Sequence, residues 1–148
     1  MTATPAIEIK GQLPSTLLSD YKLIAFDMDS TLITIECIDE IADITGKKAE
    51  VAAITEAAMR GEIADYKESL RQRMALLQGV PMADIERVLQ ERLQLTPGAK
   101  TLVDAAHAAG LKVLLVSGGF TFFANHVKSL LGIDFVRANI FDVQDGKL

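Results

Sequence analysis

The stretch Phe26-Asp27-Met28-Asp29-Ser30-Thr31-Leu32-Ile33 decides the fold class of this chain. It continues a short apolar run, 23–25, and turns abruptly polar, which is typical of a buried parallel strand with polar residues at its carboxyl end. Open α/β sheets bind their ligands at that end. In an extended stretch Asp27 and Asp29 point to the same side, where two carboxylates repel unless a cation or shared proton compensates. By itself the Asp-x-Asp spacing also fits a plain polar turn.

A second apolar run, 111–116, also ends in a polar and glycine-rich cluster, Ser117-Gly118-Gly119, which leads into a helix expected over 121–131. Two strand ends of the same kind predict one shared site at one edge of a parallel sheet. The Ser117 hydroxyl can donate a hydrogen bond to a phosphate there. The glycines let backbone N–H groups approach that phosphate closely, beside the positive end of the helix. An ordinary helix N-cap is the alternative role for Ser117.

About 75 residues separate the two strands, far more than the crossover of a βαβ unit requires. Apolar residues recur in them at helical spacing in four stretches, so we expect a four-helix cap inserted over 37–95. The α/β core then comprises 21–36 and 96–148, and residues 1–20 form an N-terminal arm. A small helical cap that follows a strand tip can cover the site and exclude water.

Further elements are expected after the cap. Residues 99–109 read as a helix that Gly110 ends, and 133–138 and 140–143 read as two more strands. Asp145-Gly146 is a strong hairpin signal. The chain stops where the returning strand should begin, so we expect the parallel sheet to be incomplete.

Composition limits the classes of partner. The 148 residues carry 15 Lys and Arg against 20 Asp and Glu, a net charge of -5, which excludes the basic stripe that nucleic acid binding requires. The single cysteine, Cys37, excludes an intrachain disulfide and a cysteine-based zinc cage. No apolar run is long enough to span a membrane, and the N-terminus has no signal-peptide pattern. We therefore expect a cytoplasmic protein without a membrane partner, and the oligomeric state stays open.

The stretch 26–33 closely resembles the first motif of haloacid dehalogenase-type phosphatases, and Ser117-Gly118-Gly119 is similar to their second motif. The resemblance implies a Rossmann-like core in which Asp27 attacks phosphorus and Asp29 acts as general acid and base. It also implies that Ser117, Gly118 and Gly119 bind the transferring phosphoryl group, and that Asp27 and Asp29 hold Mg²⁺. The chemistry is sound, because a carboxylate can form an acyl phosphate while a neighbouring acid protonates the leaving oxygen.

The cap carries a narrower resemblance. The stretches 34–42, 54–61 and 69–77 look like the cap of bacterial and archaeal phosphoserine phosphatases, which remove phosphate from O-phosphoserine in the last step of serine biosynthesis. The resemblance implies that Glu36 pairs with the substrate amino group and that Arg73 holds its carboxylate. Without it, both would read as solvated charges on helices.

Met59 and Tyr66 match residues that line the pocket in that family. Their place in the helical pattern alone predicts that they belong to the core of the cap instead. Tyr66 stands where the family more usually has Phe.

The chain also departs from the family. Its third motif, a Lys, and its fourth, Gly-Asp-Gly-x-Asn-Asp, are absent, because the only acids after Gly119 are Asp134, Asp142 and Asp145. We therefore expect a truncation after Leu148 and no meaningful activity from the 148 residues alone. A phosphatase for another small phosphomonoester and a non-catalytic binding module are the alternatives. A dehalogenase is disfavoured, since it has no need of Asp29.

Overall fold

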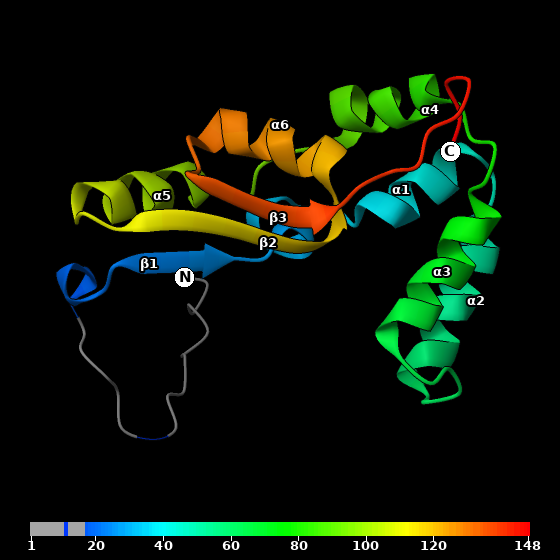
Figure 1. Cartoon of the computed structure of the whole chain (residues 1–148), viewed down its shortest axis with the longest axis horizontal. Coiled ribbons are helices and arrows are strands. Elements are labelled where there is room, and N and C mark those ends of the chain that lie inside the picture. The colour runs from blue at the N-terminus through cyan, green and yellow to red at the C-terminus, as the bar shows by residue number, and fades with distance from the viewer. Residues whose placement is uncertain (1–10, 12–16) are drawn as a thin grey trace, which may run out of the picture.

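A three-stranded parallel sheet forms the centre of the computed structural model, which describes residues 11 and 17–148 (Figure 1). The strands lie in the order β1 (Leu23–Phe26), β2 (Lys112–Phe120) and β3 (Phe135–Asn139). Ile24 lies opposite Val113 and Leu114 opposite Phe135. The expected parallel α/β core is confirmed. The arm expected over 1–20 lies largely outside the described residues, apart from a short 3₁₀ turn, η1 (Leu18–Asp20).

Two helices, α5 (Ala99–Ala108) and α6 (Thr121–Leu131), cover one face of the sheet (Figure 1). Both crossovers advance across the sheet in the same direction, from β1 to β2 and from β2 to β3. Because such connections are right-handed, both helices pack on the same side. Beneath them lie fully buried side chains of β2, Val113 and Leu115. Apolar burial on this face holds the core together.

The opposite face of the sheet remains partly open. Leu23 is 49% exposed, Val116 46% and Phe135 48%. The sequence predicted strands buried on both faces, and this is wrong for one face. The physical reason is that α5 and α6 both occupy the other side.

The helical insertion is confirmed. Its helices are α1 (Cys37–Ile44), α2 (Lys48–Met59), α3 (Tyr66–Leu76) and α4 (Met82–Arg87), which continues as the π-type turn η3 (Val88–Arg92). The α2 and α3 helices pack side by side and project from the end toward which the strands point (Figure 1). The chain enters and leaves the insertion at adjacent points, where Ile33 bridges to Leu95. Among the described residues, every helix is too short or too polar to cross a lipid bilayer.

The C-terminal segment differs from the prediction. Residues 140–143 form no strand, because they run from the sheet toward the cap and no other strand of the described residues lies beside them to pair with. The turn at Asp145 and Gly146 is confirmed, with φ values of 50° and 74° that suit a primed hairpin turn. Beyond it, the Leu148 N–H donates to the Val80 carbonyl at 3.0 Å, which ties this end of the chain to the linker between α3 and α4.

Candidate active site

Asp27 and Asp29 line one pocket of about 450 Å³ at the tip of β1. One oxygen of Asp27 accepts the Met28 N–H at 2.8 Å, and the other oxygen has no hydrogen-bond partner among the described residues. The chain then forms an irregular π-type turn, η2 (Met28–Leu32), with Ser30 in the left-handed region at a φ of 53°. This turn, rather than an extended strand, brings the two carboxylates to the same pocket.

Cys37 holds both oxygens of Asp29. Its backbone N–H donates to Oδ2 at 3.1 Å and its thiol to Oδ1 at 3.3 Å. Burial raises the pKa of the Cys37 thiol well above its ordinary value, so the thiol keeps the proton that it donates. Burial also raises the pKa of Asp29; the Cys37 donors oppose this shift, and the neighbouring charges of Glu36 and Asp27 add to it. A carboxyl group in this setting holds a proton to higher pH than an ordinary aspartate, as a general acid requires.

The tip of β2 corrects one prediction. Ser117, Gly118 and Gly119 do not follow the strand but belong to it, in a register irregularity between Val116 and Phe120. Such a bulge breaks the regular ladder and redirects its residues, commonly beside active sites. The N-cap residue of α6 is Phe120, so the role of Ser117 as an ordinary N-cap is wrong.

The two strand tips meet in this pocket. The Ser117 hydroxyl accepts the Gly119 N–H at 2.9 Å and keeps its own hydrogen to donate. A Cβ added to Gly119 would lie 3.1 Å from the Ser117 oxygen and 3.8 Å from Asp29 Oδ2. The glycine therefore leaves open the space between the serine and the carboxylate, where a phosphate group can approach both.

The cap supplies Tyr66 and Arg73 to the same pocket. The Tyr66 hydroxyl donates to the Gly118 carbonyl at 3.1 Å. Arg73 makes one long hydrogen bond, to the Ser69 carbonyl at 3.4 Å, and no ion pair with a carboxylate of the described part of the chain. Its guanidinium is therefore available to an anionic ligand. Glu36 lies at the rim, where Oε1 accepts the Ser30 hydroxyl at 2.6 Å.

Met59 is the one candidate that the structure does not bring to the pocket. It ends α2 and is 85% exposed, whereas Tyr66 is 57% exposed. The alternative that these two side chains form the core of the cap is therefore wrong. The pocket also includes Ile38 and Asp39, which the sequence interpretation missed. Asp39 follows Glu36 by three residues at the start of α1, and helical spacing could have indicated their shared face.

The charge of the pocket favours a cation. In the part of the chain that the structure describes, four acidic side chains and one guanidinium line the pocket, and carboxylate oxygens are the ligands that Mg²⁺ prefers. No group of three His, Cys, Asp or Glu residues in the described ranges converges closely enough to hold a metal ion. The carboxylate chemistry of Asp27 and Asp29 suits Mg²⁺, and their role in holding the ion stays a prediction. The acidic lining comprises Asp27, Asp29, Glu36 and Asp39.

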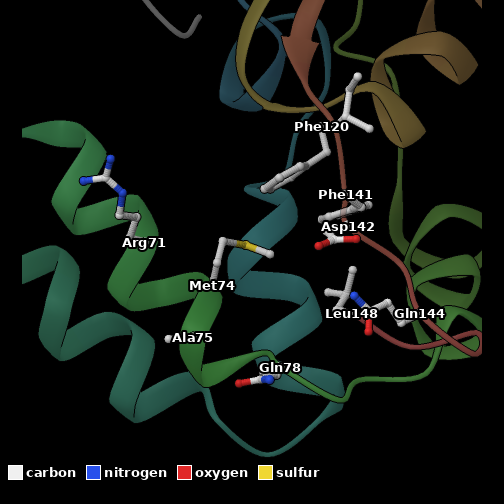
Figure 2. A pocket seen from close by; sticks show the side chains of 10 residues that line it. Arg71, Met74, Ala75, Gln78, Phe120, Phe141, Asp142, Gln144 and Leu148 are labelled. Carbon is white, nitrogen blue, oxygen red and sulfur yellow. The ribbon is translucent and has the colours of Figure 1, made fainter.

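A second cavity, of about 480 Å³, lies between α3 and the C-terminal segment. Figure 2 shows Met74 of α3 on one side and the rings of Phe120 and Phe141 on the other. The two rings stack with their centroids 3.9 Å apart. Its charged residues are Arg71 and Asp142, so it has no pair of carboxylates and lacks the chemistry of the first pocket.

Comparisons with known proteins agree with this geometry. A family model described as haloacid dehalogenase-like hydrolase matches residues 21–147. A phosphoserine phosphatase from Polaromonas sp. (strain JS666) is 63% identical over 145 residues, which cover 98% of this chain and 61% of the relative. Two solved structures, a phospho-aspartyl intermediate analogue of phosphoserine phosphatase and a substrate-bound phosphoserine phosphatase complex, each superpose with a TM-score of 0.79 at 42% identity. Each match covers 86% of this chain and 60% of the solved one. The chain thus spans about three fifths of each of these three proteins.

Proposed function

The chain belongs to the haloacid dehalogenase-like hydrolases, and we propose that its protein hydrolyses O-phosphoserine to serine and phosphate. The observation that carries the proposal is the meeting of Asp27, Asp29 and Ser117 in one pocket that Arg73 of the cap also lines. A phosphoserine phosphatase from Polaromonas shares 63% of the aligned residues, which supports this substrate over other phosphomonoesters. The reaction would complete the biosynthesis of serine.

Asp27 is the nucleophile in this proposal. Its free oxygen attacks phosphorus and forms an acyl phosphate, while the bond from phosphorus to the serine oxygen breaks. Asp29 donates its proton to that departing oxygen. Asp29 then removes a proton from a water molecule that cleaves the acyl phosphate, so both residues return to their starting states.

The other residues bind and orient the substrate. Ser117 donates to the phosphoryl group, and the Gly118 and Gly119 backbone lies beside the N-terminus of α6, which favours anions. Arg73 pairs with the substrate carboxylate, and Glu36 offers its second oxygen to the ammonium group. Mg²⁺ held by Asp27 and Asp29 would neutralise phosphoryl charge when bound.

The 148 residues alone should turn over little substrate. The pocket brings four carboxylates to an anionic phosphate with one guanidinium, and electrostatic stabilisation is usually the largest contribution to such catalysis. Two carboxylates hold Mg²⁺ weakly, since the ion demands near-octahedral geometry. The Polaromonas relative has a part that this chain does not match. A chimera in which that part is joined after Leu148 should therefore be active, in contrast to the chain alone.

The test combines that chimera with acid-quench labelling from ³²P-phosphoserine in the presence of Mg²⁺. The unmodified chimera should release phosphate, and Asp27→Asn should neither label nor turn over. Asp29→Asn should accumulate label on Asp27, because hydrolysis of the intermediate slows more than its formation. Label on Asp29, or full activity in Asp27→Asn, would remove Asp27 as the nucleophile. Preference for a phosphomonoester other than phosphoserine would replace the substrate.

A further inference from the structure

A hydrogen bond joins the outer end of the cap to the strand that carries Ser117. Tyr66 is the first residue of α3, and its hydroxyl donates to the Gly118 carbonyl in the irregular part of β2 at 3.1 Å. The residues are 52 positions apart in the chain. Tyr66 of the cap and Gly118 of the core both line the pocket, so the bond connects the cap side of the pocket wall to the core side.

The Gly118 carbonyl is suited to this contact. The register irregularity takes it out of the regular sheet ladder, so both lone pairs can accept side-chain donors. One accepts Tyr66, and the other accepts the Asn139 amide of β3 at 2.8 Å. The same oxygen therefore has one donor from the cap and one from the core. Removing the first donor gives a test variant, and removing the second gives its matched control.

Glycine at position 118 provides the space for the tyrosine ring. A Cβ there would lie 2.1 Å from the Tyr66 hydroxyl oxygen, a distance at which something must move, and 3.0 Å from the ring carbon that bears it. Gly118 is not among the glycines with positive φ. Its backbone therefore permits alanine, and the cost of a side chain falls on the contact with Tyr66.

The bond also bears on Arg73. Tyr66 and Arg73 lie seven positions apart on α3, about two turns, so they share a helix face, and both line the pocket. At the other end of α3, the Lys47 ammonium donates to the Leu76 carbonyl, which holds the base of the α2 and α3 pair. These two contacts therefore lie on either side of the part of α3 that carries Arg73.

We propose that Tyr66 is a positioning residue whose bond to Gly118 holds the α2 and α3 pair closed over the pocket, with Arg73 turned toward Asp27. Breaking the bond swings the pair outward about its base and opens the pocket. The importance of this closure for turnover rests on the proposed function, but the closure itself does not.

Spin-label distances in the 148-residue chain test the proposal without substrate. Ala53 of α2 and Ala105 of α5 are exposed, and each is replaced by cysteine and labelled. Native Cys37 is fully buried, so the unmodified chain should take up no label. Labelled chain is diluted into unlabelled chain so that only intramolecular distances are measured. One dominant distance is expected, and Tyr66→Phe should raise the ratio of open to closed forms about two- to tenfold, as the loss of one hydrogen bond predicts.

Two further variants separate the bond from general loosening. Gly118→Ala should populate the same longer distance, because its Cβ displaces Tyr66. Asn139→Ala removes the other donor to the same carbonyl, within the core, and should leave the distance unchanged. Circular dichroism spectra should confirm that each variant is folded.

The outcomes bear separately on the two proposals. Distances in Tyr66→Phe equal to those of the unmodified chain, or an equal shift in Asn139→Ala, would overturn the role of Tyr66. An open population in Tyr66→Phe alongside a chimera that does not hydrolyse phosphoserine would support the positioning role and overturn the function.

Discussion

The Asp134 carboxylate stabilises the fold and takes no part in the proposed chemistry. It lies at the edge of the sheet that is remote from the pocket. The Val113 N–H donates to it at 2.9 Å, His107 lies at 2.9 Å and the Lys112 ammonium at 3.0 Å. These partners, the backbone N–H first, hold the pKa of Asp134 well below its usual range. The ionised form is therefore favoured in the folded chain. Its stabilising effect is complete above the unfolded pKa of about 4 and is lost as the pH falls below that value.

Asp134→Asn should accordingly lower the melting temperature near pH 7, and the difference from the unmodified chain should shrink toward pH 2. Thermal melts followed by circular dichroism between pH 2 and 7 measure this. Asp104→Asn is the matched control, since Asp104 pairs with Lys100 on the exposed surface of α5. It should change the melting temperature little at any pH. A constant difference between Asp134→Asn and the unmodified chain across the range would contradict the assignment.

Arg73 and Glu36 should matter for the amino acid part of the substrate. In the active chimera, Arg73→Ala and Glu36→Ala should each lower kcat/KM for phosphoserine. The loss should correspond to about 2–4 kcal/mol of transition-state stabilisation, because a charged group loses its partner. An aryl phosphate without the zwitterion should be affected much less, since remote binding energy no longer orients its phosphate. Arg71→Ala is the control, because Arg71 lies on the same helix but lines the second cavity. Equal losses on both substrates would mean that Arg73 and Glu36 only support the cap.

The sequence predicted several residues of the pocket but not the contacts that these residues make. Asp27, Asp29 and Ser117 follow apolar runs, and strand patterning alone places them at one edge of a sheet. The two bonds from Cys37 to Asp29 were not predictable, because they depend on a turn that Ser30 makes with a positive φ. The burial of Cys37 and the direction of its two donors are properties of the folded turn.

Helices and strands were predictable where a local sequence pattern is sufficient to specify them. Helical spacing alone indicated all four helical segments of the cap, and the structure has each of them. The strand predicted over 140–143 failed because a strand also needs a neighbour, which local alternation does not report. The irregular end of β2 was missed for a related reason, since its register is set by β3 rather than by its own residues.

The N-terminus of α3 offers a test at the same scale. The Asp65 side chain accepts the Glu68 N–H at 2.8 Å and caps the helix that carries Tyr66 and Arg73. Asp65→Ala should cost about 1 kcal/mol of helix stability, and Asp65→Asn, which keeps an acceptor, much less. Hydrogen exchange of the α3 amides, read against those of α5, measures the local loss. Equal exchange in both variants would show that the cap residue does not stabilise α3.

At the scale of the whole molecule, the cap and the core are joined where Ile33 bridges to Leu95. We propose that the inserted unit spans 37–95, between core segments 21–36 and 96–148, because both chain crossings lie together there. The connections between the strands of the core explain why one face of the sheet is buried and the other is partly exposed. Right-handed connections in a single direction place α5 and α6 together, so the direction of strand order determines which sheet face stays open.

The open face of the sheet should make the 148-residue chain associate in solution. Leu23 of β1 and Phe135 of β3 are each about half exposed, and a contiguous apolar surface of this kind drives association. Sedimentation velocity should therefore show a weight-average mass that rises with concentration, and Leu23→Lys with Phe135→Lys should shift it toward the monomer. The control carries Leu102→Lys and Leu130→Lys, which are 43% and 45% exposed on the helices of the opposite face. That variant should associate like the unmodified chain, because the added charges do not touch the open face. Equal suppression by both pairs would indicate that net charge, rather than the sheet face, governs association.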